Sequence, residues 1–405
     1  MPEQGIQTDK STSGLYNKTK DYIKNSASAV YETLSNPMQA LAKMNKFRET
    51  TGVMILSIIT IVIIFLCIVY YVYIRTLQTS NCNFMDSIYG KINGSLRSLT
   101  VTDKQCQFKF NEYYIKTAYN CCSGGSYKND FVSLCALKDV IRQGVRGLDF
   151  EVFSINDRPV IATSTVDSYY IKETYNSIDF ADIMGVIRDY AFSNSTCPNP
   201  TDPIILHLRI KSTNQNMYQN FAKLFESYDS ILLGKEYSYE NHQENLGNRK
   251  LLDFIGKIVI IVDRSNLAFM ECEDFYEYVN MTSNSMFMRA LSYYDIANNP
   301  DLVELQAFNK RNMTIGMPDK GANPINPNGI VMREAGCQLL AMRYQYVDQY
   351  LEENIAFFDK SGLAFVLKPL RLRFQVTTIP DLVEQNPELN YADRIVQSDF
   401  YKFNI

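Results

Sequence analysis

The sequence predicts an α/β fold of alternating strands and helices, preceded by one transmembrane helix. Short apolar segments typical of buried strands alternate with amphipathic segments typical of helices, which favours a β/α architecture. A single long apolar run, residues 53–74, comes before them. The clearest strands are expected at residues 147–153, 203–210 and 257–262, and the clearest helices at 134–143, 180–191 and 217–228.

Residues 53–74 form an uncharged, largely apolar run of 22 residues, VMILSIITIVIIFLCIVYYVYI. As a helix it is long enough to span a hydrocarbon core of about 30 Å. Tyr70, Tyr71 and Tyr73 cluster at its far end, where an aromatic belt would lie. The run starts too late and is too long for a cleaved signal peptide. We therefore predict a single-pass signal anchor, with the membrane as one partner of the chain.

Basic residues flank this run unevenly. Lys43, Lys46 and Arg48 precede it, and only Arg75 follows closely. The positive-inside rule then predicts a cytoplasmic N-terminus, with the remainder lumenal or extracellular, or on a virion membrane.

Cysteines and glycosylation sequons are consistent with that orientation. Eight of the nine cysteines follow the run, an even number suited to disulfides, although buried free thiols are an ordinary alternative. Four sequons follow it too, and an Asn-rich chain also produces sequons by chance. They begin at Asn93, Asn194, Asn280 and Asn312.

The segment before the run, residues 1–52, is polar and nearly balanced in charge. An amphipathic helix on a membrane surface and a loosely ordered tail both suit it. The whole chain has a net charge of −4 and no basic block, so nothing supports nucleic-acid binding.

Three motifs resemble the catalytic barrel of phosphoinositide-specific phospholipase C. They are IRQGVRGLDFE at 141–151, PIILHLRIKST at 203–213 and GCQLLAMRYQYVDQYLEENIAFFDKSGLAFVLKPLRLR at 336–373. The resemblance implies a (β/α)8 TIM-type barrel over about 113–375, a span of the usual size for one barrel.

The resemblance also implies a domain organisation. The barrel halves would be about 113–234 and 251–375, joined by a short polar linker in which His242 would be a solvated residue. A juxtamembrane stalk, 75–112, would precede the barrel, and a C-terminal tail, 376–405, would follow it.

The family cleaves phosphoinositides with two histidines and a calcium ion, which is held by an asparagine and three carboxylates. By resemblance, the histidine positions fall at Tyr119 and Thr163. Neither side chain is a base at neutral pH without a large change in its pKa. His207 is a candidate relocated base, but it is predicted to be a hydrogen-bonded core histidine, one layer deeper in the barrel than Arg209.

The metal site is altered in the same comparison. Asn120 keeps the asparagine position, and Asp149 and Glu151 keep two carboxylates in exchanged order, whereas Arg209 replaces the third. The alternation of strand side chains points all three charged residues into the barrel. We expect calcium binding to be lost and the guanidinium to bridge the two carboxylates, since buried charges must be paired.

The positions that correspond to the family's substrate contacts also differ. Phosphate-binding lysines are replaced by Ile261 and Asp263, and an Arg and a stacking Tyr by Ile315 and Met317. We therefore expect a pseudoenzyme, an anchored binding or structural module that contacts a protein partner and has no cofactor.

Two alternatives stay open. One is an active phosphodiesterase with a rearranged, calcium-independent site that uses His207, Arg209 and Glu151. The other is a structural protein of a viral envelope or virion membrane. Hydrolysis of phosphoinositide analogues separates the first alternative from the rest, and purification with partners separates the second.

Overall fold

The computed structural model describes residues 21, 24–26, 28, 37–166, 170–238, 244–376 and 393–405. His242 lies outside these residues, and so does the expectation made for it. The chain forms two compact units, Met1–Leu77 and Gln78–Ile405.

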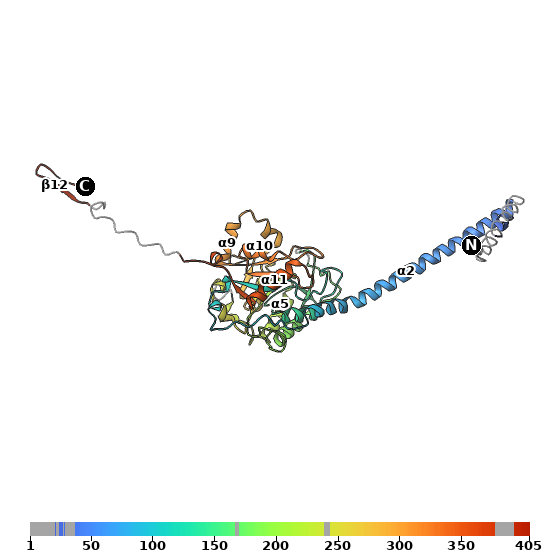
Figure 1. Ribbon diagram of the computed structural model, residues 1–405, viewed down its shortest axis with the longest axis horizontal. Coiled ribbons are helices and arrows are strands. Elements are labelled where there is room, and N and C mark those ends of the chain that lie inside the picture. Colours follow the sequence, from blue (N-terminus) through green and yellow to red (C-terminus); the bar gives the residue numbers. More distant parts are fainter. Residues whose placement is uncertain are drawn as a thin grey trace, which may run out of the picture. The chain divides into compact units, whose positions relative to one another are not determined.

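Helix α2, Pro37–Tyr89, contains the predicted transmembrane run (Figure 1). Large apolar side chains at consecutive positions from Val53 onward are exposed, so the helix is apolar on all sides, as membrane-spanning helices are. By length and composition it can cross a membrane. The helix continues beyond residue 74 because residues 75–89 contain neither Gly nor Pro, and it ends before Gly90.

The second unit is built on a nearly closed barrel of eight parallel strands. Their hydrogen-bonded order is β7-β6-β5-β2-β1-β10-β9-β8, and in the described part of the chain no ladder joins β7 to β8. The strands are β1 (Tyr113–Ala118), β2 (Gly147–Ile155), β5 (Ile204–Ile210), β6 (Ile258–Asp263), β7 (Met281–Ser283), β8 (Met288–Ser292), β9 (Met313–Met317) and β10 (Leu339–Met342).

Three further strands extend this sheet without belonging to the ring. β3 (Arg158–Ala162) forms an antiparallel hairpin with β2, and β4 (Ile178–Asp179) pairs with β3. β11 (Phe365–Leu367) runs antiparallel to β1. A separate exposed hairpin near the C-terminus consists of β12 (Ile395–Gln397) and β13 (Lys402–Asn404).

Helices connect the strands, and their starts follow capping residues in the sequence. The side chains of Ser133, Asn214 and Asp348 each accept a hydrogen bond from a backbone N–H in the first turn of their helices. The helices are α3 (Leu134–Arg142), α4 (Phe180–Val186, continued by the η3 turn Ile187–Ala191), α5 (Gln215–Glu226), α7 (Glu273–Tyr276), α8 (Tyr293–Ala297), α9 (Leu302–Arg311), α10 (Gly329–Glu334) and α11 (Gln349–Ser361).

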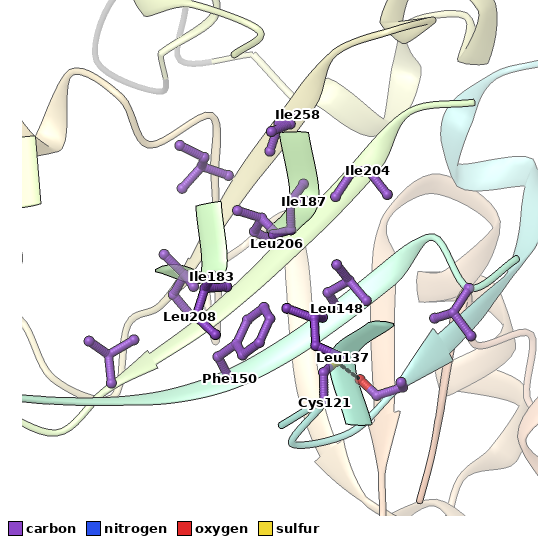
Figure 2. Close-up of a cluster of buried hydrophobic side chains, with 14 of the residues drawn as sticks. Cys121, Leu137, Leu148, Phe150, Ile183, Ile187, Ile204, Leu206, Leu208 and Ile258 are labelled. Carbon is purple, nitrogen blue, oxygen red and sulfur yellow. Dashed lines mark hydrogen bonds between the residues drawn. The ribbon is translucent and has the colours of Figure 1, made fainter. Parts of the chain in front are cut away.

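The main core lies between the strands and the helices. Figure 2 shows Leu148 and Phe150 of β2 and Leu206 and Leu208 of β5 pointing toward the same helices. The residues between them in sequence therefore point into the barrel. The register places Asp149 opposite His207 and Glu151 opposite Arg209. A second apolar cluster, which includes Ile205, Val259, Ile315 and Leu339, fills the barrel below these polar residues.

The predicted strands and helices lie within two residues of the observed bounds, but the elements between residues 263 and 328 were not predicted. Three helices and three strands, α7, α8, α9, β7, β8 and β9, lie in that segment, together with the η7 turn (Ala268–Glu271). The strands among them have only three to five residues, which is too short for a periodic pattern to distinguish them from loops.

Candidate functional site

The candidate site lies inside the barrel, at the carboxyl ends of β1, β2 and β5. Tyr119 and Asn120 directly follow β1, Asp149 and Glu151 belong to β2, and Arg209 belongs to β5. All five are buried. Asn120 has a φ of 47°, a left-handed conformation that asparagine tolerates better than most residues.

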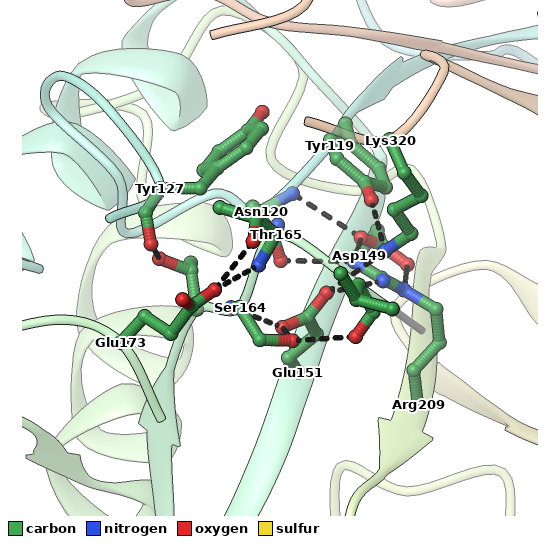
Figure 3. A network of polar contacts seen from close by, with 12 residues as sticks. Tyr119, Asn120, Tyr127, Asp149, Glu151, Ser164, Thr165, Glu173, Arg209 and Lys320 are labelled. Carbon is green, nitrogen blue, oxygen red and sulfur yellow. Dashed lines mark hydrogen bonds and ion pairs between the residues drawn. The ribbon is translucent and has the colours of Figure 1, made fainter. Parts of the chain in front are cut away.

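Arg209 connects the two carboxylates, as predicted from the strand alternation (Figure 3). Its Nε and Nη2 donate to Asp149 Oδ1 and Oδ2 at 3.0 and 2.7 Å, and its Nη1 donates to Glu151 Oε1 at 2.5 Å. Nη2 also donates to Asn120 Oδ1 at 2.9 Å. The guanidinium carbon lies 4.5 Å from the centre of the Tyr119 ring. The guanidinium is thus held by oxygen atoms on three sides and by an aromatic face.

A second cation, Lys320, enters the site from the loop after β9, and sequence analysis missed it. Its Nζ donates to Tyr119 Oη at 2.8 Å and to Glu151 Oε1 at 3.1 Å. The charges of Arg209 and Lys320 balance those of Asp149 and Glu151, whereas the predicted three-residue cluster carried a net charge of −1. No local pattern marks Lys320, because it lies 169 residues from Glu151 in sequence.

These contacts determine the protonation states in the cluster. Burial alone would raise the pKa of Asp149, but Arg209 and His207 outweigh it and hold that pKa well below its usual range. Burial is likewise outweighed at Glu151, whose pKa is lowered by Arg209 and Lys320. Burial raises the pKa of Tyr119, although both cations oppose the change. The site at neutral pH therefore contains two carboxylates and a neutral phenol.

The loop after β3 closes the other side of the cluster. Thr163 is buried and its Oγ1 donates to the backbone oxygen of Tyr127 at 2.9 Å. Ser164, which was not predicted, donates from its backbone N and its Oγ to Glu151 Oε2 at 2.8 and 3.0 Å. Thr165 makes an equivalent pair of bonds to Glu173 Oε2 at 2.7 and 2.6 Å (Figure 3). These hydroxyl groups hold the loop and the Glu151 carboxylate in place.

His207 is a hydrogen-bonded core residue, as predicted. Its side chain is fully buried, with Nδ1 2.7 Å from Asp149 Oδ1 and Nε2 2.9 Å from Ser283 Oγ. Since the Asp149 carboxylate only accepts hydrogen bonds, Nδ1–H is the donor to it. Both ring nitrogens are therefore engaged inside the barrel.

A cavity of about 480 Å³ opens above the cluster. Of the predicted site residues, Tyr119 and Arg209 line it, whereas Asn120, Asp149, Glu151 and Thr163 lie behind its wall. Lys211 and Lys320 contribute positive charge to the lining, and Asp263 and Asp295 contribute negative charge. The cavity falls within the usual size range of small-molecule sites.

The four positions assigned to substrate contacts lie in two environments. Ile261 and Ile315 are fully buried in the lower apolar cluster. Asp263 and Met317 line the cavity, and Asp263 accepts hydrogen bonds from Ser265 N at 2.6 Å and Asn284 Nδ2 at 3.2 Å. None of the four brings a cation to the cavity.

Comparisons with known proteins agree on the barrel. Residues 107–264 match the family model of the phosphatidylinositol-specific phospholipase C, X domain. Crystal structures of PLC21 from S. officinalis and from L. pealei resemble the fold, each with a TM-score of 0.52 and 18% identity, covering 66% of this chain. The chain covers 38% of the length of those proteins. No curated protein matches the chain.

Proposed function

We propose that this chain, which carries a phosphoinositide-specific phospholipase C X domain in a barrel of that family's fold, is a membrane-anchored binding module without phosphodiesterase activity. The observation that supports the proposal most directly is the Arg209 guanidinium between Asp149 and Glu151. It fills the centre of the site with a fixed protein cation, where the enzymes of the family use a bound metal.

The donor set does not suit calcium. Calcium takes six to eight oxygen ligands. Here both Asp149 oxygens, Glu151 Oε1 and Asn120 Oδ1 already accept hydrogen bonds from Arg209. Glu151 Oε2 accepts from Ser164. A divalent cation placed among these atoms would lie against the guanidinium, so Coulomb repulsion would oppose its binding.

Acid–base groups for transfer of a phosphoryl group are also missing at the expected positions. The Tyr119 phenol has a raised pKa and accepts a hydrogen bond from Lys320. The Thr163 hydroxyl donates a hydrogen bond to the Tyr127 carbonyl oxygen. His207 is held below the cavity by Asp149 and Ser283. A general base must reach the proton that it removes, and no histidine among the described residues lines the cavity.

The cavity itself remains suited to ligand binding. Its lining brings together lysine, aspartate, asparagine and serine side chains with the rings of Tyr119 and Tyr170. These groups can hydrogen-bond to a small polar ligand or to a polar segment of a partner protein, while the rings and apolar side chains of the lining provide packing surface. Binding without turnover is the role that this combination supports best.

The test is hydrolysis of phosphatidylinositol in vesicles by the full-length protein, with calcium and with a chelator. We expect no turnover above background, because loss of a single general acid–base group already removes roughly 10²–10⁴ in rate. The melting temperature should not respond to calcium. Turnover that disappears in His207→Gln, while that variant keeps its melting temperature, would contradict the proposal and favour the rearranged phosphodiesterase.

The membrane anchor belongs to the same proposal. Helix α2 supplies the span, and the excess of Lys43, Lys46 and Arg48 before it supports a lumenal, extracellular or virion-surface barrel. A structural role in a virion membrane would use the same orientation. Purification of the full chain from its native membrane distinguishes the two: a stoichiometric structural partner without ligand binding favours the structural role.

A further inference from the structure

Three of the four glycosylation sequons that follow the run of residues 53–74 lie at the barrel end opposite the cavity. Asn280 directly precedes β7 and Asn312 directly precedes β9, so both lie at the amino ends of strands. Asn194 lies in the loop that leads from the η3 turn into β5. The cavity is formed at the carboxyl ends of the strands. In a β/α barrel the loops at the carboxyl ends and those at the amino ends lie on opposite faces, so these three sequons face away from the cavity.

The side chains of Asn280 and Asn312 make hydrogen bonds within the barrel. Asn280 is only 3% exposed, and its Oδ1 accepts from the backbone N of Ile260 at 2.8 Å. Its Nδ2 donates to the carbonyl oxygens of Gly234 and Tyr237. Asn312 is half-buried and its Oδ1 accepts from Asn245 Nδ2 at 2.9 Å. A sugar on Asn280 would have to pass through the packed interior.

Asn93 is also tied to the barrel. Its Nδ2 donates to Asp359 Oδ1 at 2.9 Å, and its Oδ1 accepts from the backbone N of Ser95. Asp359 belongs to the last turns of α11. Attachment of a sugar to this nitrogen would disturb the contact between the segment after α2 and α11.

Asn194 differs from the other three. Its side chain is exposed, and among the described residues it has no hydrogen-bond partner. The neighbouring hydroxyls of Ser193 and Ser195 bond to each other at 2.8 Å. Thr196, the third residue of the sequon, donates to the carbonyl oxygen of Tyr190 at 2.7 Å. The loop is thus held by its neighbours while the Asn194 amide projects into solvent.

We infer that Asn194 is the N-glycosylation site of this protein. The reaction requires a lipid-pyrophosphate-linked oligosaccharide and its transferase. The Asn194 Nδ2–C1 bond forms as the bond from C1 to the pyrophosphate oxygen breaks, and the amide proton leaves with the pyrophosphate. The inference rests on the lumenal orientation proposed above. The Cys82–Cys135 disulfide supports that orientation, because disulfides persist in the oxidising secretory pathway. A glycan at this loop leaves the cavity open.

The experiment expresses the full chain in eukaryotic cells and treats it with an N-glycan-cleaving glycosidase. We expect one mobility shift, lost in Asn194→Gln and in Thr196→Val. Thr196→Ser is the matched control, since it changes the same residue but retains the sequon, and it should keep the shift. Asn280→Gln should also keep it, although the variant should unfold at a lower temperature.

A shift that survives Asn194→Gln would overturn the assignment, and so would the complete absence of a shift. Protease treatment of sealed membrane vesicles prepared from the same cells, with their cytoplasmic face outside, separates the causes. A protected but unglycosylated barrel refutes only the Asn194 site, whereas a digested barrel refutes the lumenal orientation as well. Neither result bears on the absence of phosphodiesterase activity, which the vesicle hydrolysis assay measures independently.

Discussion

At the scale of single residues, Arg209 determines what the candidate site can do. Its side chain is 4% exposed and faces two carboxylates that are not exposed at all. A buried charge is tolerated only when it is paired, so the cation and the two anions form one unit. Lys320 completes the balance from the cavity side, with a side chain that is 25% exposed.

Arg209→Met is expected to destabilise the barrel by about 3–5 kcal/mol, because it leaves two buried carboxylates with Lys320 as their main counter-charge. Arg209→Lys is the matched control. It retains the charge but not the paired donors, so its loss should be smaller. Thermal and urea unfolding of the full chain in detergent measure both variants. A loss below about 1 kcal/mol for the methionine variant would contradict the paired-charge interpretation.

The same residues predict a dependence on pH. The pKa values of Asp149 and Glu151 are lowered in the folded state. Their contribution to the free energy of unfolding is therefore fully present above the unfolded-state values, about 4, and is lost as pH falls through the lower folded values. The stability difference between wild type and Arg209→Met should narrow below about pH 4. An unchanged difference down to pH 2 would argue against this linkage.

At the scale of elements, the last turns of α2 belong to the barrel's core. Met85 and Tyr89 are buried in the main apolar cluster, and the Tyr89 ring packs edge-on against Tyr344 at 5.6 Å. The Cys82–Cys135 disulfide fastens this segment to α3. The other cysteines, all described by the structure, are free, and those beyond the transmembrane run are buried. The eight cysteines beyond the run thus form one disulfide and contribute six buried thiols to the core, so they do not form a disulfide framework.

Alkylation under denaturing conditions tests this pairing. Seven of the nine cysteines should react before reduction and all nine after it. Reduction, or Cys82→Ser, should lower the free energy of unfolding by about 2–4 kcal/mol, since the bridge closes a loop of 53 residues. The Cys82→Ser variant also serves as the control for reduction: without the disulfide, its melting temperature should be the same with and without reductant. Nine reactive thiols before reduction would rule the disulfide out.

At the scale of the whole molecule, the proposed orientation predicts the outcome of proteolysis. In sealed vesicles whose cytoplasmic face is outside, the barrel should be protected and the segment before residue 53 should be cut. Disruption of the vesicles with detergent should expose the barrel to the same protease, which controls for intrinsic resistance. Digestion of the barrel in intact vesicles would reverse the predicted topology and remove the rationale for a glycan at Asn194.

The sequence by itself determined the properties that depend on neighbouring residues. The apolar run of 53–74 specified a helix long and apolar enough to cross a membrane, because helix length and hydropathy depend only on local sequence. Strand alternation placed Asp149, Glu151 and Arg209 on one side of the sheet, because successive side chains of a strand point in opposite directions. The bridge between them then followed from the need to pair buried charges.

Only the tertiary structure decided which distant residues meet. Lys320 of the loop after β9 contacts Glu151, and Ser283 of β7 contacts His207, and no local pattern predicts either pair. Packing likewise decided that Cys82 pairs with Cys135 while six other thiols beyond the run stay buried and free. It also left Asn194 exposed and enclosed Asn280. Burial and partner choice are set by contacts between segments far apart in the chain, so periodicity and composition cannot supply them.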